Sequence, residues 1–300
     1  MFNKFLLLNQ ITKSLVEKGY KTFITQGCFD VAARRECLLL LKTLINIDGL
    51  TRKQALSLRT IAYFLSAYPL VISIKNNKYK LDDNVIYSRF SLPVLTPKLF
   101  DSVITEEISV IQSAKGRHTV EIDVVTLREK RKELNYTIEE LAKLIGISKK
   151  ALYEIENKRV LPSIKTVKKL ENELKVNLRM PYSIQHPKPA HLEPKNKFQK
   201  EVSREFTRIG IDNSPVYSAP FELVGKERFS MIAGLSENVK QIRHEVSVVK
   251  ELSSIFLSHA IFISKDCRER SLEGIPIISM SELAEIKSSR ELNKIIAEKI

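Results

Sequence analysis

The chain has 300 residues, enough for two or three domains, and 43% of them are hydrophobic, an ordinary fraction for a globular protein. It carries 49 Lys and Arg against 35 Asp and Glu, a formal net charge of +14, and has no run of about 18 apolar residues that would span a membrane. The three cysteines, Cys28, Cys37 and Cys267, have no CxxC spacing, which argues against a zinc site and a disulfide framework and favours a reducing cytoplasm.

Residues 1–112 predict an N-terminal α/β module. The spacing of apolar residues indicates a helix from Phe5 to Lys18, two strands within 20–44, a long helix from Arg52 to Tyr68 and an apolar strand at 70–75. The stretch "SLPVLTPKLFDSV" then closes the module.

Residues 113–180 predict a strand or hairpin, "AKGRHTVEIDVV", followed by four short helices from Leu127 onward. Thr137 caps the second helix, and Glu140 three residues later completes a capping box. Gly146 supplies the positive φ of a sharp turn. We expect three apolar side chains of this helix to face the core: Leu141, Leu144 and Ile145.

The third helix of this group, "KKALYEIEN", begins after the capping residue Ser148. Its apolar face consists of Ala151, Leu152 and Ile155, and its other face is polar and begins with two lysines. A fourth helix, capped by Ser163, follows. Short helices joined by a glycine turn, with a polar third helix, predict a helix-turn-helix whose recognition helix spans about 149–157.

Residues 181–200 contain four prolines and few large apolar side chains, so we expect an extended linker without a helix or an inner strand. Residues 201–300 predict a C-terminal α/β module. Its order of elements repeats that of the first module: "LVISIK" matches "AIFISK", and Phe29-Asp30 matches Phe221-Glu222. This pattern indicates an internal duplication of one α/β module.

The stretch "LREKRKELNYTIEELAKLIGISKKALYEIENKRVLPSIKTVKKL" resembles the Cro-type (XRE) repressor domain over about 55 residues. The matching features are T-x-E-E-L-A, the G-I-S turn, I-E-N and the P-S before the fourth helix. The whole chain resembles a set of archaeal HTH-type regulators, which carry "FD-x-x-A-R-R", "L-L-K" and "N-I-D" before the helix-turn-helix. Here these are Phe29-Asp30, Ala33-Arg34-Arg35, Leu40-Leu41-Lys42 and Asn46-Ile47-Asp48.

The resemblance implies a DNA-binding surface on the third helix. Lys149, Lys150 and Glu154 occupy the positions that face base edges. The other implied contact residues, to bases or phosphates, are Thr137, Tyr153, Asn157, Lys158 and Arg159. The resemblance also implies a buried ion pair between Arg131 and Glu156. The sequence departs from the family pattern at Ile138, where Gln is common, and at Lys158, where Gly is common.

The N-terminal module also resembles a nuclease-type core, in which one Asp and an E-x-K on the next strand hold magnesium. Asp30 and Lys42 match that pattern, but Leu40 stands where the glutamate is required. In the C-terminal module, Glu222 and Gly234 replace the Asp and the Lys. We therefore expect degenerate modules with no metal, no cofactor and no catalytic residue, although Glu36 or Asp48 could substitute for the missing carboxylate.

Positive charge is concentrated before residue 201. The net charge is +6 over residues 1–110, +6 over 127–180, +3 over 181–200 and −1 over 201–300. This distribution favours a polyphosphate partner for the first two thirds of the chain. We expect a cytoplasmic regulator that binds double-stranded DNA, a homodimer with an unknown effector or protein partner and no membrane contact. The alternatives are a metal-dependent DNA nuclease and a nucleoid-associated protein without sequence preference.

Overall fold

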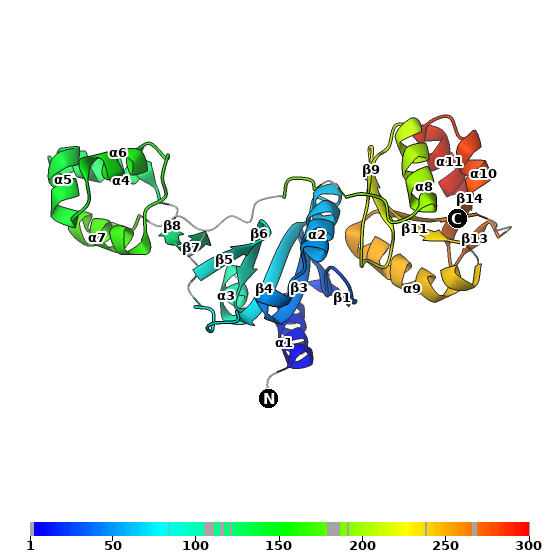
Figure 1. Ribbon diagram of the computed structural model, residues 1–300, viewed down its shortest axis with the longest axis horizontal. Helices are drawn as coiled ribbons and strands as arrows, with labels where there is room; N and C mark the ends of the chain where they lie inside the picture. Colours follow the sequence, from blue (N-terminus) through cyan, green and yellow to red (C-terminus); the bar gives the residue numbers. More distant parts are fainter. Residues whose placement is uncertain are drawn as a thin grey trace. The chain divides into compact units, whose positions relative to one another are not determined.

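The computed structural model describes residues 3–83, 85–104, 111–114, 117–120, 122–178, 187–190, 192–237, 239–265 and 269–299 (Figure 1). By its internal contacts the chain divides into two compact units, Met1–Ile72 with Gln185–Ile300, and Ser73–Ile184. Within the described residues, no helix is both long enough and apolar enough to cross a membrane.

The first unit begins with the N-terminal part of the chain. Its elements are α1 (Lys4–Glu17), β1 (Lys21–Ile24), β2 (Val31–Arg34), β3 (Leu38–Asn46), the 3-10 helix η1 (Ile47–Gly49), α2 (Arg52–Phe64) and the first part of β4 (Tyr68–Lys75). The strands lie in the order β1-β2-β3-β4. Asn3 caps α1 and a Thr51–Gln54 capping box starts α2. Of the two strands predicted within 20–44, the second, at 28–44, is in fact two antiparallel strands, β2 and β3.

The second unit contains the rest of β4 and the helix-turn-helix region. Its elements are β5 (Val85–Arg89), β6 (Leu92–Leu95), α3 (Pro97–Val103), β7 (Ile111–Ala114), β8 (Arg117–Val120), α4 (Val124–Glu133), α5 (Ile138–Ile145), α6 (Lys149–Glu156) and α7 (Ile164–Leu174). The strands lie in the order β4-β6-β5-β7-β8. A strand is confirmed within the stretch predicted as a strand or hairpin: it is β8, which pairs antiparallel with β7, directly before that stretch.

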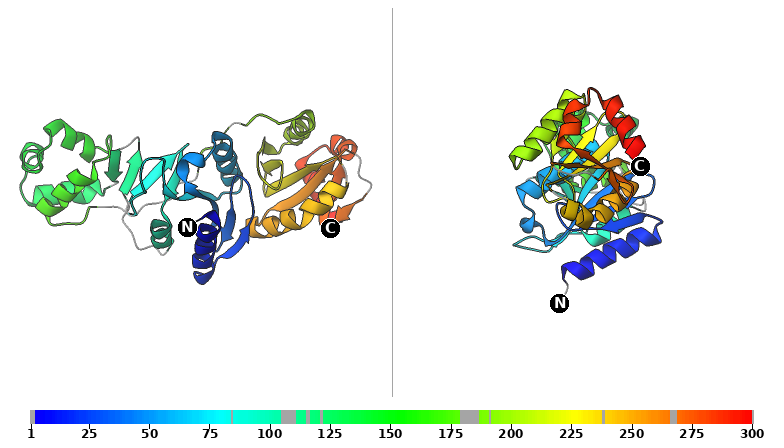
Figure 2. Two further views of the ribbon diagram at one scale, coloured as in Figure 1. Left: turned by 60° about the horizontal axis from the view of Figure 1, so that its bottom comes forward. Right: turned by 90° about the vertical axis from the view of Figure 1, so that its right-hand side faces the viewer.

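The C-terminal part of the first unit has its own sheet. Its elements are α8 (Lys197–Arg208), β9 (Asp212–Pro215), β10 (Leu223–Lys226), β11 (Ser230–Ser236), α9 (Val239–Phe256), β12 (His259–Ser264), β13 (Ser271–Leu272), β14 (Ile275–Ser279), α10 (Met280–Glu285) and α11 (Ser289–Lys299). Helices α8, α10 and α11 lie on one face of the sheet and α9 on the other (Figures 1 and 2).

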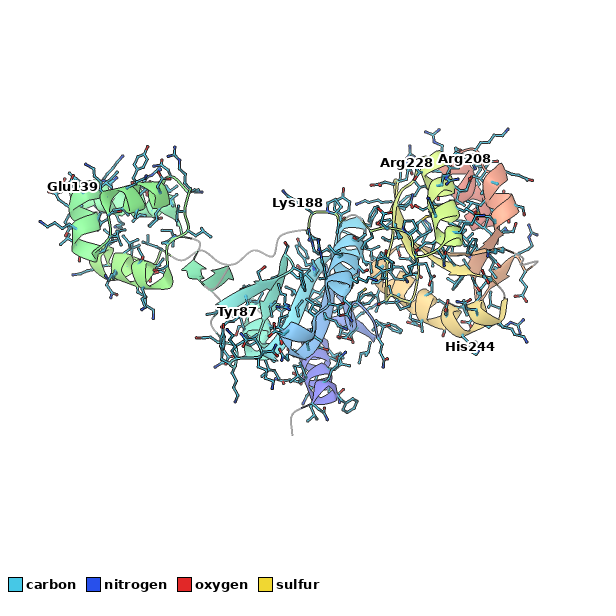
Figure 3. All side chains as sticks on the ribbon, viewed as in Figure 1. Tyr87, Glu139, Lys188, Arg208, Arg228 and His244 are labelled. Carbon is cyan, nitrogen blue, oxygen red and sulfur yellow. The ribbon has the colours of Figure 1, made fainter. Side chains whose placement is uncertain are left out.

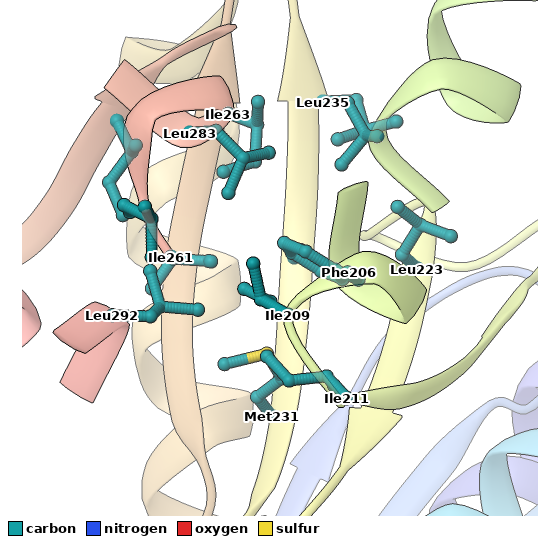
Figure 4. Packing of buried hydrophobic residues seen from close by; sticks show 14 of the residues in the cluster. Phe206, Ile209, Ile211, Leu223, Met231, Leu235, Ile261, Ile263, Leu283 and Leu292 are labelled. Carbon is teal, nitrogen blue, oxygen red and sulfur yellow. The ribbon is translucent and has the colours of Figure 1, made fainter. Parts of the chain in front are cut away.

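Apolar side chains fill the space between the sheet and α8, α10 and α11 (Figure 4). Phe206 of α8 and Leu283 of α10 are fully buried there against Ile261 and Ile263 of β12. Complete burial of such a side chain stabilises the fold by about 1.5–3 kcal/mol. The helices are thereby fixed on this face of the sheet.

The two α/β modules have the same topology. We call α1–α3 the N-terminal module and α8–α11 the C-terminal module. In each, a helix is followed by three strands, a long helix, three strands and a helix. The strand orders, β1-β2-β3-β4-β6-β5 and β9-β10-β11-β12-β14-β13, correspond strand by strand. The pairs β1/β2, β2/β3 and β5/β6 are antiparallel, as are their counterparts. This correspondence supports the duplication predicted from the sequence.

The predicted linker is wrong at its C-terminal end. Helix α8 begins at Lys197, capped by the side chain of Asn196, so residues 197–200 are helical. Phe198, which is 7% exposed, anchors this first turn in the core. The predicted domain boundaries at residues 112 and 180 stay predictions. The two compact units are defined by their internal contacts instead, and their boundary falls within β4, after residue 72.

Candidate nucleic-acid interface

Helices α4 to α7 enclose a small apolar core. Each helix begins with a side chain that accepts hydrogen bonds from its first turn: Asp123, Thr137, Ser148 and Ser163. The core is formed by residues of all four helices, among them Leu127, Leu141, Leu152 and Leu170, each fully buried. The caps and the core together fix the orientation of the short helices.

The turn between α5 and α6 has the predicted form. Gly146 ends α5 with φ of 71°, a left-handed conformation that glycine adopts without a steric penalty. Lys169 of α7 donates through Nζ to the carbonyl of Ile145 at 2.7 Å, and its positive charge is favourable at this helix C-terminus. The start of α6 is therefore held by both the turn and α7.

A buried ion pair joins α4 to α6. Arg131 donates through Nε and Nη2 to the two carboxylate oxygens of Glu156, at 2.7 and 3.1 Å. Arg131 also donates to the carbonyl of Tyr136 at 2.9 Å. The residues are 9% and 3% exposed. The ion pair implied by the family resemblance is therefore present, and its bidentate geometry fixes the rotation of α6 about its axis.

Arg128, one turn before Arg131, is a residue that the sequence reasoning missed. Its guanidinium donates to the backbone carbonyl of Glu156 and, at 3.1 Å, to Oδ1 of Asn157. Asn157 in turn donates through Nδ2 to the carbonyl of Tyr153 at 2.8 Å. The side chain of Asn157 is thus engaged within the domain, so it supports the end of α6.

The polar side chains predicted for DNA contact lie on the outside of α6 and at its end. Lys149 donates to Glu139 of α5 at 2.8 Å, and both side chains are about two thirds exposed. Glu139 lies on the outside of the helix-turn-helix (Figure 3). Tyr153 is 45% exposed, and the Arg159 guanidinium lies 5.8 Å from the centre of its ring. Exposed ion pairs contribute about 0–1 kcal/mol, so Lys149 can exchange its partner at little cost.

Two further members of the predicted set differ in their surroundings. Lys150 is exposed and has no ion-pair partner among the described residues. Glu154 is half-buried and forms an ion pair with Arg159 at 3.3 Å. Both charges can reorganise toward a nucleic acid, but Glu154 must first give up the contact with Arg159.

Lys158 adopts the left-handed conformation that the glycine of related domains would favour. Its φ is 57°, and it directly follows Asn157, the residue that caps the C-terminus of α6. A non-glycine residue there carries a steric penalty of about 1 kcal/mol or more. The side chain is exposed, so the substitution places a cation at the end of α6 at the expense of some backbone strain.

Leu144 requires a correction, whereas the capping box of Thr137 is confirmed and its DNA contact stays a prediction. The hydroxyl of Thr137 bonds to both the amide and the carboxylate of Glu140, so the capping box occupies the side chain. The Thr137 backbone amide, which donates to the Glu140 carboxylate at 2.8 Å, and then the Thr137 hydroxyl lower the pKa of the Glu140 carboxyl. Leu144, predicted to face the core, is 55% exposed. The side chains of α5 that pack in the core on either side of it are Leu141 and Ile145.

The nuclease-like position of the N-terminal module is saturated by internal contacts. Oδ1 of Asp30 accepts from Lys4 and Lys42, at 2.8 and 3.1 Å, and Oδ2 accepts from the amide and the hydroxyl of Thr43, at 2.8 and 3.1 Å. A carboxylate has about four acceptor positions. All four are used here, and Asp30 is 1% exposed. Burial lowers the pKa of Lys42, and the negative charge of Asp30 opposes this effect.

The C-terminal module keeps the carboxylate but not the lysine. Glu222 accepts from the amide of Leu235 at 2.8 Å, as Asp30 accepts from the amide of Thr43 at the matching position. Gly234 stands where the first module has Lys42, and a Cβ there would lie 2.3 Å from the ring of Phe262. Without that lysine, burial raises the pKa of Glu222 to about 7.

A divalent metal does not fit either position. Leu40, fully buried, occupies the place of the second carboxylate, and the oxygens of Asp30 are already bonded to two ammonium groups and Thr43. Glu36 lies in the turn after β2, and Asp48 lies in η1 after β3. Each is several residues along the chain from the part of the sheet beside Asp30. Across the described ranges, no cluster of three His, Cys, Asp or Glu side chains could hold a metal ion.

The helices α4 to α7 and the module before them define a helix-turn-helix protein with a nuclease-like domain. A family model described as "Helix-turn-helix" matches residues 127–180, and one described as "PD-(D/E)XK superfamily domain" matches residues 5–110. Both agree with the resemblances found in the sequence. No solved structure matches the chain.

Relatives match almost the full length of the chain. A protein of Methanothermobacter thermautotrophicus, named "Putative HTH-type transcriptional regulatory protein", is 32% identical over 98% of this chain and 96% of its own length. A protein of the same name from Methanobrevibacter smithii is 30% identical over 100% and 99%. The chain belongs to this family of archaeal HTH-type transcriptional regulatory proteins.

Proposed function

We propose that the protein is a transcription regulator that recognises a specific double-stranded DNA sequence, with α6 in the major groove. The observation that carries this proposal is the exposed face of α6, where Lys149, Lys150 and Tyr153 stand on a helix whose orientation Arg131 and Glu156 fix from below. The names of the relatives, which describe transcriptional regulators, support the same function.

The chemistry of this face suits base and phosphate contacts. Lys149 and Lys150 can donate to O6 and N7 of guanine, and Glu154 can accept from N4 of cytosine. Lys158 and Arg159, just after α6, are exposed cations that would bind phosphates. Arg128 adds a half-exposed cation beside Asn157. The proposed recognition surface therefore combines base-reading and phosphate-binding side chains.

A homodimer is the second part of the proposal. The chain has one helix-turn-helix within its matched domains, and a single recognition helix reads only a few base pairs. Two chains related by a two-fold axis would read an inverted repeat with half-sites about 34 Å apart.

Selection of bound duplexes from a random DNA library, at about physiological salt, tests the proposal. An enriched inverted repeat supports a dimeric, sequence-reading regulator, and its spacing reports the separation of the two recognition helices. An enriched single half-site would support a sequence-specific regulator but would contradict the proposed homodimer. No enrichment, with binding that collapses as salt rises, would favour the nucleoid-associated alternative.

The PD-(D/E)XK match favours one other candidate function, a metal-dependent nuclease. The saturated Asp30 carboxylate and the apolar Leu40 argue against it. Supercoiled plasmid incubated with the protein and Mg²⁺ or Mn²⁺ decides the question. We expect no nicking; nicking that Asp30→Asn abolishes would instead establish the nuclease.

A further inference from the structure

We propose that the C-terminal module is the built-in partner of the N-terminal module: within one chain it occupies the self-complementary face through which two separate modules would form a two-fold dimer. All the contacts that carry this inference lie within the unit Met1–Ile72 with Gln185–Ile300. The inference does not depend on the proposed DNA-binding function.

Reciprocal contacts join the two modules at the C-termini of their long helices. Arg34, the last residue of β2, donates to the carbonyl of Phe256 at 3.0 Å and to that of Ile255, at the end of α9. In the duplicated position, Lys226 ends β10 and donates to Oγ of Ser66 at 3.1 Å, just after α2. A cation from each module thus meets the helix end of the other, where its charge is favourable.

This exchange is the defining property of an isologous interface, in which a position i contacts j of the partner and j contacts i. A further contact joins the C-terminal module to the end of α2: the hydroxyl of Ser230, at the start of β11, donates to the carbonyl of Phe64 at 2.8 Å. Helix α9 contacts β1 and β2, and α2 contacts β10. The two modules therefore present matching faces to each other.

Equivalent segments also meet where a two-fold axis would pass. The segment before β2 and the segment before β10 touch directly: the amide of Cys28 donates to the carbonyl of Ser218 at 2.5 Å. Gly27 has φ of 149°, and a Cβ on it would lie 2.0 Å from that carbonyl oxygen. Only a residue without a side chain permits this approach.

Aromatic side chains close the interface behind these segments. Phe29 and Phe221, which occupy matching positions in the two modules, both pack on Phe256, with ring centres 6.3 and 6.2 Å apart. All three are at most 3% exposed. A buried aromatic cluster of this kind is typical of a permanent interface rather than of a transient contact between domains.

The remnant of the nuclease motif supports the docking segment. Lys42 donates through Nζ to the carbonyl of Gly27 at 2.5 Å and to Asp30 at 3.1 Å, so it ties both ends of the segment 27–30. We assign Asp30 and Lys42 a positioning role: they hold the segment that contacts Ser218. Because the C-terminal module covers this face, a second chain would have to use another surface.

Chemical cross-linking of isotopically mixed protein tests the inference. Lys53 of α2 and Lys195 before α8 both lie over the ring of Tyr217, at 5.9 and 5.2 Å from its centre, so their amines are no more than about 11 Å apart. Full-length chains labelled with ¹⁴N and ¹⁵N are unfolded together, refolded and cross-linked with an amine-reactive reagent. Mass spectrometry then separates links within one chain from links between chains.

We expect Lys53–Lys195 links that join only peptides of the same isotope. Mixed-isotope links at the statistical level would show that the module docks on another chain, and would overturn the proposal. The absence of any Lys53–Lys195 link, with other lysine links formed normally, would overturn it as well, because the modules would then not pack together.

A glycine pair supplies matched variants. Gly27→Ala should reduce the yield of the Lys53–Lys195 link several-fold, because the new methyl group meets the Ser218 carbonyl. Gly210→Ala is the control, since Gly210 also has a positive φ, of 87°, but no atom lies within 4 Å of the added Cβ. If Gly27→Ala does not fold, Arg34→Ala takes its place and should increase hydrogen exchange at the end of α9. A wild-type link yield in Gly27→Ala, or unchanged exchange in Arg34→Ala, would contradict the proposed interface.

Discussion

Arg131 holds both carboxylate oxygens of Glu156, at 2.7 and 3.1 Å, and thereby connects α4 to the last turn of α6. The pair is almost completely buried, so neither charge has water as an alternative partner. The orientation of the proposed recognition helix depends on this contact more than on any exposed ion pair in the domain.

Arg131→Ala should destabilise the helix-turn-helix by about 3–5 kcal/mol, because it leaves the buried Glu156 carboxylate with only the longer ion pair to Arg128, at 3.8 Å. Hydrogen exchange of the α4–α7 amides in the full chain measures this loss locally. Glu139→Ala, which removes only the exposed pair with Lys149, is the control and should change the same amides by less than about 1 kcal/mol. Equal effects of the two variants would show that the buried pair has no special role.

Lys158→Gly should stabilise the domain by up to about 1 kcal/mol, because glycine adopts the left-handed conformation at φ of 57° without a steric penalty. The same change should weaken binding to all duplexes similarly and reduce the slope of log K against log salt by about 1, if the lysine neutralises one phosphate. Thermal unfolding and binding at several salt concentrations separate the two effects. A loss of stability would contradict the backbone argument.

Glu222 predicts a pH dependence of stability in the C-terminal module. Burial raises its pKa to about 7 in the folded chain, above the value near 4.5 of an exposed glutamate. The folded state therefore holds the proton more tightly, and this stabilisation, at most about 3 kcal/mol, is present below pH 4.5 and is lost as the pH rises to 7.

Glu222→Gln removes that titration. The stability difference between wild type and variant, measured by denaturant unfolding from pH 5 to 8, should shift in favour of the variant as the pH rises. Glu251→Gln, an exposed change on α9, is the control. A difference that stays constant over this range would contradict the assignment to Glu222.

Divalent metals should not affect the N-terminal module. We expect the same unfolding temperature in EDTA, Mg²⁺ and Mn²⁺, because Lys4, Lys42 and Thr43 occupy the oxygens of Asp30. Lys42→Met should destabilise the module by about 3–5 kcal/mol in all three conditions, since Asp30 remains buried with its charge poorly compensated. Stabilisation by Mn²⁺ that Asp30→Asn removes would show that a metal binds after all.

Local signals in the sequence predicted much of the helix-turn-helix. The capping residues Thr137, Ser148 and Ser163 and the turn residue Gly146 act within one helical turn, so their roles could be inferred from spacing alone. The face of Leu144 could not be predicted in this way. Its apolar side chain follows Leu141 by three residues and adjoins Ile145, so the pattern of α5 alone groups it with the core, and only the packing of α6 and α7 leaves it exposed.

Contacts between residues far apart in the sequence could not be predicted in this way. The contact of Arg128 with Asn157 spans 29 residues, and that of Arg34 with Phe256 spans 222, so no local pattern could indicate them. The duplication was visible in matched motifs, but the packing of one copy on the other was not. The strand β5 and the helix α11 were also missed, because the repeat comparison did not extend to them.

The claim that α6 reads DNA sequence is tested most directly by a matched pair of double variants. Lys149→Ala with Lys150→Ala removes two charges from the proposed recognition face, and Lys165→Ala with Lys168→Ala removes two exposed charges from α7 of the same domain. Each is measured against a selected duplex and against random duplex at about physiological salt. Each base contact contributes about 1–3 kcal/mol to the discrimination between duplexes. We therefore predict that the preference for the selected duplex falls about 10-fold or more in the α6 variant and is unchanged in the α7 variant. If both variants lost the same affinity for the two duplexes and kept the preference for the selected one, the recognition role of α6 would be contradicted.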